Sequence, residues 1–356
     1  MRILLVGARP PPDGGMTVLF EQLAQELGGL ADVHVVDTSR RGRGRGVVAA
    51  ATAARCAALL GRVDVIGHHA SPAGATQFGP LLLSMARASG RPYVLRLFGG
   101  ALDRWFTAQT PEKRRLYELI LRADRVLLET RAQVAWFRAR YPRARILWYP
   151  NIRPLYRRPR ITRPATRRFV FLGHVKPTKG VRVLLDAVRL LGDVDLQVDV
   201  FGPLQDGLTT ADLAGIEGLD YWGEIRANAV VPVLAAADAL LLPSFYDGEG
   251  YPGVVLEAFA AGTPVIATRW RAIPELVEPG RNGMLVSPGD PAELAAAMRQ
   301  LIVAPERLPV LRAGAWQTAR RFTSTRWTRT YLHILRRVVA GEACVDPPPV
   351  GRLSLG

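Results

Sequence analysis

The chain of 356 residues has only two cysteines, Cys56 and Cys344, and almost none of its 47 basic residues is a lysine. Two cysteines so far apart in sequence exclude a disulfide framework and a cysteine-based zinc site, and they fit a reducing cytoplasm. No charge-free run of about 18 apolar residues occurs, so we expect no membrane-spanning helix. The first residues, MRILLVGARPPPDGG, have too short an apolar part for a signal peptide and predict a first buried strand.

Acidic residues are also scarce: there are 31 against 47 basic residues, which gives a net charge of +16. A GC-rich genome is one explanation for so many arginines. Whatever its origin, the charge should draw the protein toward phospholipid headgroups, polyphosphates or nucleic acid. The sequence has no aromatic-basic motif typical of nucleic-acid recognition, so we expect no nucleic-acid partner.

Short apolar runs alternate with helix-length segments in two series. The first series of runs covers residues 2–7, 33–37, 63–69, 93–100, 125–130 and 145–150, and the second covers 168–174, 196–202, 239–244, 263–268 and 283–287. Strands separated by helices predict parallel sheets that are covered on both faces. We therefore expect an α/β protein with two doubly wound, Rossmann-like domains.

Residues 153–168, RPLYRRPRITRPATRR, interrupt this alternation with seven arginines, three prolines and no acid, which predicts a solvated linker. We expect an N-terminal domain over 1–152 and a C-terminal domain over 169–322. A helix within 323–340 should pack back onto the first domain, although its arginines also fit contact with a membrane surface. The remaining tail, 341–356, ends in DPPPVGRLSLG, which we expect to be disordered.

The stretch DGEGYPGVVLEAFAAGTPVIA (247–267) predicts a helix that begins near Pro252 and Gly253. The first N–H groups of that helix, around Gly253 to Val255, would be free to bind an anion. Glu249 precedes the helix and Glu257 lies one turn into it, so each could bind hydroxyls on one side of the anion. A ligand with hydroxyls on both sides of phosphates is a nucleotide sugar. The alternative is that Glu257 supports the helix dipole and Glu249 is a loop acid.

A second candidate segment is FLGHVKPTKG (171–180), where a strand is followed by Lys179 at the carboxyl edge of the sheet. Lys179 could neutralise a diphosphate leaving group, on which charge accumulates as the sugar–phosphate bond breaks. A solvated lysine at a helix start is the alternative. It is less attractive because two of the three lysines in the chain, Lys176 and Lys179, fall in this segment.

Two segments of the first domain are weaker candidates. PPPDGGMTV (10–18) places Gly14 and Gly15 between a strand and a helix start, which permits close approach of a phosphate but equally describes a plain turn. VDVIGHHAS (63–71) ends a strand with His68 and His69, which point to opposite faces. They lack a third metal ligand at a recognisable spacing, and either could be a structural, hydrogen-bonded histidine.

The stretches PSFYDGEGYPGVVLEAFAAGTPVIAT and IPELVEPGRNGMLVSPGD closely resemble the signature of glycosyltransferase family 4. The resemblance covers the whole chain and is strongest over 168–300. It implies the GT-B fold, in which two Rossmann-like domains face each other across a cleft. It also implies a retaining transferase that needs no metal and uses a nucleotide-diphosphate sugar as its co-substrate.

Roles follow from this resemblance residue by residue. Catalytic roles fall to Glu249, His69 and Lys179, and Glu257 would bind the ribose hydroxyls. Donor binding falls to these residues and to Gly14, Gly15, His174, Gly250, Tyr251, Pro252, Gly253 and Val254. The family usually has an arginine where this chain has His174, so His174, Lys176 or another arginine would have to supply the second phosphate cation. Gly99, Gly100 and Asp103 are weak acceptor-side candidates, and DVD (193–195) is interpreted as a turn and not a metal motif.

From these features we expect transfer of a hexose or related sugar to an acceptor hydroxyl. With the +16 charge, the resemblance suggests a lipid-linked or saccharide acceptor in bacterial polysaccharide or glycolipid assembly. A cytoplasmic enzyme peripheral to the inner face of the plasma membrane would fit. The alternative is a sugar-nucleotide-binding subunit of the same fold with impaired catalysis. The donor base and sugar, the acceptor and the oligomeric state stay open.

Overall fold

The chain divides into two compact units, each built around one parallel sheet. The computed structural model describes residues 1–11, 15–40, 42, 44–155, 167–192 and 194–346. Unit 1 comprises Met1–Ile152 together with the segment that begins at Ser324, and unit 2 comprises Arg153–Thr323. None of the described helices is long and apolar enough to cross a membrane.

The described part of unit 1 contains a six-stranded parallel sheet with the order β2-β1-β3-β4-β5-β6. Its strands are β1 (Arg2–Gly7), β2 (Asp32–Asp37), β3 (Val65–Ala70), β4 (Tyr93–Leu97), β5 (Arg125–Leu128) and β6 (Ile146–Trp148). Strands β3, β4 and β5 are buried along their whole length, as expected for a parallel sheet covered on both faces. The chain order reverses between β1 and β3, and ligands of open α/β sheets bind at the carboxyl ends beside such a switch point.

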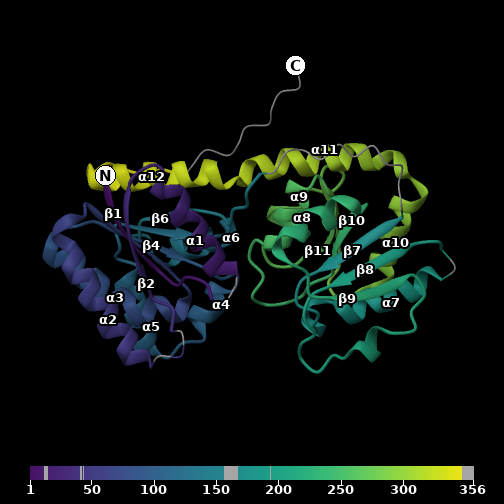
Figure 1. Ribbon diagram of the computed structural model, residues 1–356, viewed down its shortest axis with the longest axis horizontal. Coiled ribbons are helices and arrows are strands. Elements are labelled where there is room, and N and C mark those ends of the chain that lie inside the picture. Colours follow the sequence, from purple (N-terminus) through teal and green to yellow (C-terminus); the bar gives the residue numbers. More distant parts are fainter. Residues whose placement is uncertain (12–14, 41, 43, 156–166, 193, 347–356) are drawn as a thin grey trace, which may run out of the picture. The chain divides into compact units, whose positions relative to one another are not determined.

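Helices cover both faces of this sheet (Figure 1). On one face lie α2 (Arg45–Leu59), α3 (Pro72–Ser89) and α5 (Pro111–Ile120), and on the other α1 (Gly15–Gly28) packs against α12 (Ser324–Val339). Two shorter helices, α4 (Leu102–Thr107) and α6 (Arg131–Arg140), follow β4 and β5 and contact each other.

Helix α12 completes the core of unit 1 with aromatic side chains. Trp327 and Tyr331 are fully buried, and the ring of Trp327 lies 5.1 Å from that of Trp148, edge to face. The hydroxyl of Tyr149 donates a hydrogen bond to the carbonyl oxygen of Trp327 at 3.0 Å. The helix expected within 323–340 is thus α12, and it belongs to unit 1.

The segment after α12 also contacts unit 1. Asp346 forms an ion pair with Arg138 at 2.9 Å and accepts a hydrogen bond from the backbone N–H of Trp148 at 2.9 Å. The expectation of disorder from residue 346 onward is therefore wrong for Asp346, because its carboxylate caps the edge of the sheet. Residues 347–356 of that stretch lie outside the described residues.

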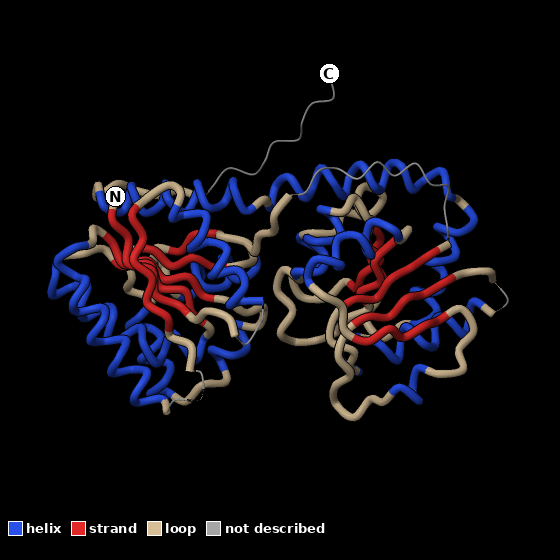
Figure 2. Tube along the Cα trace, in the orientation of Figure 1, coloured by secondary structure: helices blue, strands red, loops and turns tan. Residues whose placement is uncertain are grey.

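Unit 2 repeats the same kind of architecture with a different strand order. Its described sheet has the order β12-β11-β10-β7-β8-β9, and Figure 2 shows its strands enclosed by helices. The strands are β7 (Arg168–Leu172), β8 (Gln197–Phe201), β9 (Leu219–Gly223), β10 (Ala239–Leu242), β11 (Val265–Thr268) and β12 (Gly283–Val286). The switch point lies between β7 and β10, whose following loops hold the two segments singled out from the sequence.

Two helical layers cover this sheet. Helix α7 (Val181–Leu191) packs against α10 (Pro291–Val303), while α8 (Ala227–Ala236), α9 (Gly253–Ala260) and α11 (Leu308–Ala319) pack together in the other layer. Short 3-10 turns link these elements: η2 (Pro177–Lys179), η3 (Thr210–Leu213), η4 (Ile273–Glu275), η5 (Pro305–Arg307) and η6 (Arg320–Phe322). Unit 1 has one such turn, η1 (Leu60–Arg62), in its described part.

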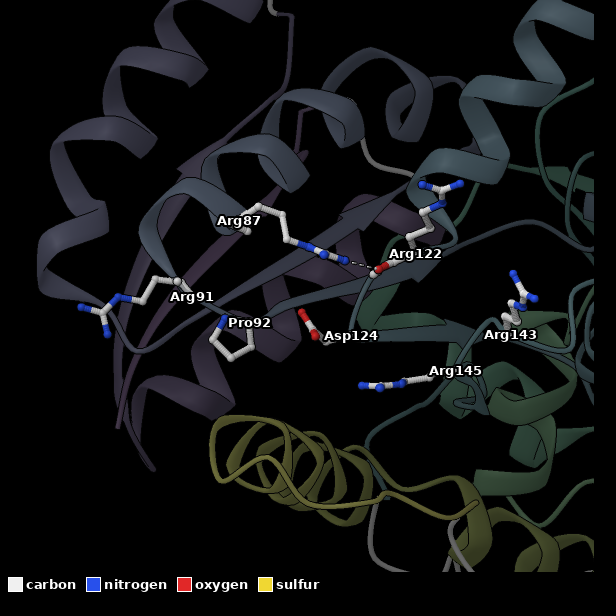
Figure 3. A pocket seen from close by; sticks show the side chains of 10 residues that line it. Arg87, Arg91, Pro92, Arg122, Asp124, Arg143 and Arg145 are labelled. Carbon is white, nitrogen blue, oxygen red and sulfur yellow. Dashed lines mark hydrogen bonds between the residues drawn. The ribbon is translucent and has the colours of Figure 1, made fainter.

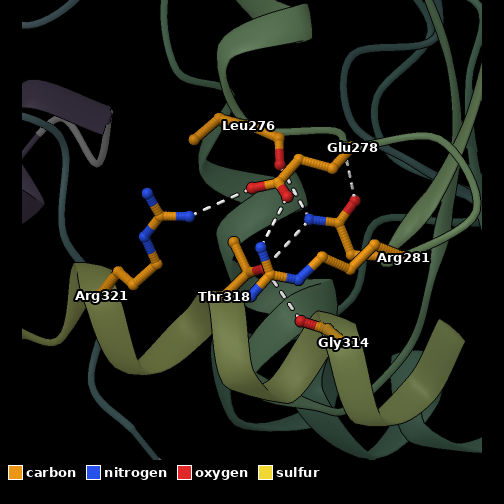
Figure 4. Close-up of polar contacts among 7 residues, drawn as sticks. Leu276, Glu278, Arg281, Gly314, Thr318 and Arg321 are labelled. Atoms are coloured by element: carbon orange, nitrogen blue, oxygen red, sulfur yellow. Dashed lines mark hydrogen bonds and ion pairs between the residues drawn. The ribbon is translucent and has the colours of Figure 1, made fainter. Parts of the chain in front are cut away.

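The loop between β11 and β12 is fastened to α11 and η6 by a cluster around Glu278 (Figure 4). Its carboxylate accepts from Arg281 at 2.6 Å and from Arg321 at 3.1 Å. Asn282 donates to the Leu276 carbonyl at 2.9 Å and contacts the Thr318 hydroxyl at 3.0 Å. The conspicuous motif IPELVEPGRNG thus holds the end of the sheet against a helix.

The arginine-rich segment 153–168 differs from a solvated linker at both of its ends. Arg153 is mostly buried and forms an ion pair with Glu257. Arg168 begins β7 and forms an ion pair with Asp199 at 2.7 Å. Residues 156–166 lie outside the described residues. The composition of the segment could not distinguish these two arginines from the other five.

Candidate functional site

The candidate site of unit 2 lies where β7 and β10 diverge at their carboxyl ends. The loop 173–180 follows β7, and the loop 243–252 follows β10 and leads into α9. The backbone N–H of Phe245 donates to the carbonyl of Thr178 at 2.9 Å, so the two loops are hydrogen-bonded to each other. Two segments some 70 residues apart in the sequence are thereby held together.

Gly180 makes this close approach possible. Its φ is +81°, and a Cβ at this position would lie 2.0 Å from the carbonyl oxygen of Pro243. No L-residue with a side chain fits there without a backbone shift, because the obstructing atom belongs to the main chain. Gly180 therefore fixes the position of Lys179, its neighbour, against the loop that carries Glu249.

Lys179 and Glu249 form an ion pair at this contact. The Glu249 side chain is only 5% exposed and that of Lys179 18% exposed, so both charges are largely removed from water. Ser244 donates a hydrogen bond from its hydroxyl to Oε1 of Glu249 at 2.8 Å. A largely buried carboxylate needs such partners, since an unpaired one would lose its hydration without compensation.

Tyr246 lies beneath two lysine side chains. The ammonium nitrogen of Lys176 is 4.2 Å from the centroid of its ring, and that of Lys179 is 5.2 Å away. Both distances permit attraction between an ammonium group and the face of an aromatic ring. The indole N–H of Trp270 donates to the Tyr246 carbonyl at 2.9 Å and helps to fix this residue. The ammonium groups of both lysines therefore lie over the ring of Tyr246.

Helix α9 begins next to these lysines. The N–H groups of Val255 and Leu256 donate to the Pro252 carbonyl at 3.1 and 3.4 Å. The N–H groups of Gly253 and Val254 precede them and have no carbonyl acceptor within the described residues. The prediction of free amides therefore fits Gly253 and Val254 but is wrong for Val255, whose amide closes the first turn of the helix.

Glu257 is held by a residue that the sequence did not single out. Nε of Arg153 donates to Oε1 of Glu257 at 2.6 Å, and the two side chains are 17% and 25% exposed. Arg153 packs directly over Gly253, where a Cβ would lie 1.9 Å from its guanidinium. Arg153 thus adds positive charge beside the first turn of α9. The only available signal was the absence of acids from 153–168.

Three further predicted donor-site residues differ in their exposure. The Tyr251 side chain is buried and its hydroxyl donates to Glu275 at 2.6 Å, so only its backbone is available to a ligand. Gly250 precedes it and is buried as well. His174 is exposed, and within the described part of the chain its imidazole has no hydrogen-bond or ionic partner.

The predicted residues of unit 1 lie at its own switch point, between β1 and β3. Gly15 is the first residue of α1, while Gly14 lies outside the described residues. His69 is the last residue but one of β3 and is almost fully buried, with Nε2 3.0 Å from the hydroxyl of Tyr331 on α12. Its Nδ1 is buried without a hydrogen-bond partner. His68 faces the other side of the sheet, with Nδ1 2.7 Å from the hydroxyl of Tyr93.

Burial keeps both histidines neutral. Burial lowers the pKa of His68 to about 3. Burial, and then electrostatic interaction with Arg96 and with His68, lowers the pKa of His69 well below its ordinary value. Arg96 is itself fully buried, with its guanidinium 4.4 Å from the Phe98 ring centroid and 4.5 Å from that of Tyr149. Neutral His69 can exchange hydrogen bonds but carries no charge for a phosphate.

The weaker candidates of unit 1, Gly99, Gly100 and Asp103, follow strand β4. The carbonyl oxygen of Gly99 accepts a hydrogen bond from the Gln133 side chain at 2.6 Å. Gly100 and Asp103 lie between the end of β4 and the first turn of α4. Across the described residues no group of three or more histidine, cysteine or acidic side chains is arranged to hold a metal ion. Asp193 of the DVD sequence lies outside the described residues, and Asp195 pairs with Arg167.

Part of this chain is similar to known glycosyltransferases. Residues 166–303 match the family model described as glycosyl transferases group 1. A D-inositol 3-phosphate glycosyltransferase from Thermobispora bispora is 34% identical over 201 residues, which cover 51% of this chain and 46% of the relative. An MMP alpha-(1->4)-mannosyltransferase from Mycolicibacterium hassiacum is 36% identical over 138 residues, which cover 37% of this chain and 33% of the relative. The matched regions span less than half the length of these curated relatives.

Solved structures extend the likeness to the whole fold. HepE from Anabaena in complex with UDP matches with a TM-score of 0.74 at 20% identity, over 94% of this chain and 100% of that chain. Both six-stranded parallel sheets with their flanking helices are included in this match. Lys179, Glu249 and Glu257 all lie within the region that matches the glycosyl transferases group 1 model, and the chain has the GT-B fold.

Proposed function

We propose that this protein is a retaining glycosyltransferase that moves a hexose or related sugar from a nucleotide-diphosphate sugar to an acceptor hydroxyl. The observation that carries the proposal is the meeting of Lys179, Ser244 and Glu249 at the switch point of unit 2, beside the start of α9. The family-model match over 166–303 supports sugar transfer as the reaction. The UDP and UDP-glucose complexes of HepE support a nucleotide-sugar donor.

In this proposal the donor changes the partners of the ion pair. The diphosphate takes the Lys179 ammonium as its own counterion, and the Glu249 carboxylate then accepts a hydrogen bond from a donor-sugar hydroxyl. Ser244 keeps Glu249 in place during the exchange, because its hydrogen bond to the carboxylate does not involve Lys179. Glu257 binds the ribose hydroxyls in the same way, while Arg153 remains beside it.

The second cation for the diphosphate is Lys176 in this proposal. The Tyr246 ring holds its ammonium group next to Lys179, whereas His174 is exposed and has no partner within the described residues. The N–H groups of Gly253 and Val254 supply further positive potential at the start of α9. Cationic side chains and helix N–H groups take the place that a divalent ion occupies in metal-dependent transferases.

The proposed chemical step is a displacement on one face of the sugar. The acceptor oxygen forms a bond to the anomeric carbon while the bond from that carbon to the diphosphate breaks, and the acceptor proton passes to the departing diphosphate. Lys179 and Lys176 stabilise the charge that develops on the leaving group. Exclusion of water from the site would limit hydrolysis, the competing reaction.

Unit 1 supplies the acceptor side in this proposal. Neutral His69 forms one hydrogen bond with a hydroxyl of the donor sugar, as donor or as acceptor. Gly15 lets the start of α1 approach a phosphate. The net charge of +16 favours a lipid-linked or saccharide acceptor at an anionic membrane surface, on its cytoplasmic side. Flotation with anionic vesicles tests the membrane part: association that does not depend on salt, or no association, rules it out.

Donor turnover by the purified protein decides between an enzyme and a binding subunit. We expect release of nucleoside diphosphate from UDP-, GDP- or ADP-sugars, with the preferred donor found first by thermal shift. Glu249→Ala should abolish this release. The exposed His174 favours the second candidate, a sugar-nucleotide-binding subunit. If the protein is such a subunit, a nucleotide sugar should raise the thermal stability of the wild-type protein, but no nucleoside diphosphate should be released.

A further inference from the structure

A wide pocket lies in unit 1 at the amino ends of β4, β5 and β6, the edge of the sheet opposite His69 (Figure 3). Its volume is about 790 Å³, within the range of ligand-binding pockets. Five arginines line it: Arg87, Arg91, Arg122, Arg143 and Arg145. The one acid among its lining residues is Asp124, which leaves the pocket strongly positive.

These arginines lack the ion pairs that arginines form elsewhere in the chain. The side chains of Arg91, Arg122, Arg143 and Arg145 have no hydrogen-bond or ionic partner within the described residues. The buried Nε of Arg91 is one of the polar atoms left without an acceptor. By contrast, Arg312 pairs with Asp238 at 2.9 Å and Arg9 with Glu21 at 2.5 Å.

The floor of the pocket is ordered by hydrogen bonds. The carboxylate of Asp124 accepts a hydrogen bond from the backbone N–H of Tyr93 at 2.8 Å. The buried guanidinium of Arg125 donates to the carbonyls of Asp124 and Glu342 at 2.5 and 2.9 Å. In Figure 3 the guanidinium of Arg87 points to the Arg122 carbonyl, which it binds at 3.0 Å, and Arg145 points toward Asp124.

Helix ends explain only part of this cluster. Helices α3 and α5 end at Ser89 and Ile120, and basic residues near a helix C-terminus are stabilised by its carbonyl groups. Arg87 lies in the last turn of α3, and Arg91 and Arg122 each lie two residues beyond the end of a helix. Arg143 and Arg145 lie beyond the end of α6, shortly before β6, and the like charges of the five arginines repel one another.

We propose that this pocket binds an anion that carries two or more phosphate groups. The planar fork of an arginine matches the oxygens of a phosphate and forms paired, charge-assisted hydrogen bonds with it. Several phosphates would satisfy the unpartnered guanidinium groups and remove their mutual repulsion. A soluble polyphosphate and the phosphates of lipid headgroups share this chemistry. The site is separate from the proposed donor site, and its existence does not depend on the proposed sugar transfer.

Labelling of single arginines tests the site in the wild-type protein. Phenylglyoxal modifies accessible arginines, and peptide mass spectrometry reports the rate at each one. Inorganic tripolyphosphate should slow modification of Arg91, Arg143 and Arg145 at least about fivefold. Exposed arginines of unit 2, Arg182, Arg299 and Arg307, should react unchanged. Rates unchanged by tripolyphosphate and by the vesicles described below would overturn the proposal, as would equal protection of both groups of arginines. Because the readout is local, binding of tripolyphosphate at the donor site does not affect it.

A vesicle experiment identifies the source of the phosphates. Vesicles of phosphatidylcholine with phosphatidic acid replace tripolyphosphate in the labelling, and protection by vesicles alone assigns the site to lipid headgroups. Arg91→Gln/Arg143→Gln/Arg145→Gln should then weaken vesicle binding at least about tenfold at moderate salt. The matched control, Arg182→Gln/Arg299→Gln/Arg307→Gln, removes the same charge from unit 2 and should weaken it less. If both triple variants weakened vesicle binding equally, the effect would come from net charge alone, and the proposal of a specific pocket would be wrong.

Discussion

The carboxyl edges of the two sheets hold different kinds of polar groups. In unit 2 the edge carries the ionised pair Lys179–Glu249, with Lys176 beside it. In unit 1 the corresponding edge carries His69, which is neutral, buried and bound to Tyr331 of α12. A charged ligand can replace one partner of an ion pair. A buried, neutral imidazole can form a hydrogen bond with a ligand but cannot neutralise its charge. This difference is the reason why the proposed function places the diphosphate in unit 2.

The largest effect is expected at Lys179. Lys179→Met should lower the rate of nucleoside diphosphate release by about 10²–10³-fold, because the leaving group loses its nearest counterion. It should also lower the free energy of unfolding by about 3–5 kcal/mol, since Glu249 is left as an unpaired, buried charge. Initial rates and urea titrations measure the two effects.

Two variants separate charge from packing in that result. Lys113→Met changes the exposed lysine of α5 and should leave rate and stability unchanged. Lys179→Met/Glu249→Gln removes both charges and should recover much of the stability without recovering the rate. If the double variant regained activity, the comparison between a charged and a neutral edge would fail.

The next effect concerns the backbone that brings the charged edge together. Gly180→Ala should lower the free energy of unfolding by about 3 kcal/mol or more, because its Cβ would lie 2.0 Å from a carbonyl oxygen. Gly207 has the same φ of +81° with nothing within 4 Å of its Cβ. Gly207→Ala should therefore cost only about 1 kcal/mol, the cost of the left-handed backbone. Equal costs would show that the contact with Pro243 does not constrain the edge.

The neutral edge predicts a pH dependence of stability. The folded pKa values of His68 and His69 lie below the unfolded value, so below about pH 6.5 the unfolded chain binds more protons. Stability from these groups is complete above that pH. It falls as the pH drops toward the folded values, by up to about 1.4 kcal/mol per pH unit for each histidine.

Urea titrations at about pH 7.5 and about pH 5.5 measure this slope. His69→Asn removes one of the two titrating groups and should reduce the slope by about half. A wild-type stability that stays level over this window would mean that the histidines are charged in the folded protein. The contrast between the two edges would then be lost.

The smallest effect is expected at the second lysine. Lys176→Met should weaken UDP binding by about three- to tenfold and leave uridine binding unchanged, because only the diphosphate contacts this ammonium group. Titration calorimetry with both ligands measures the difference. His174→Gln is the control, since the proposal gives that imidazole no phosphate. If His174→Gln weakened UDP binding more than Lys176→Met did, His174 and not Lys176 would be the second phosphate ligand.

Local patterns predicted much of the fold. The apolar runs that predicted strands are strands in both sheets, generally one to three residues shorter than expected. Strand β9 was missed because this edge strand alternates between buried and exposed residues and lacks a continuous apolar run. Most helices were expected only as segments of helical length between the strands. The short helices α4 and α6 have no long periodic pattern.

For the candidate site, the sequence predicted residues but not their partners. Lys179, which the sequence placed at the carboxyl edge of the sheet, and Glu249 lie on loops that meet at the switch point between β7 and β10. The ring of Tyr246 under the lysines and the pair Arg153–Glu257 depend on side-chain positions that no spacing encodes. The contact between His69 and Tyr331 joins residues 262 positions apart, beyond the reach of any local pattern.

Helix α12 gives the chain an order of assembly. Unit 1 is interrupted after Ile152 and resumes at Ser324, so every residue of unit 2 leaves the ribosome before unit 1 is complete. Until α12 emerges, the sheet face that it covers lacks the rings of Trp327 and Tyr331, and Tyr149 lacks its hydrogen-bond acceptor. Domains usually fold in the order of their synthesis. Here the unit whose strands are made first is the last to close its core.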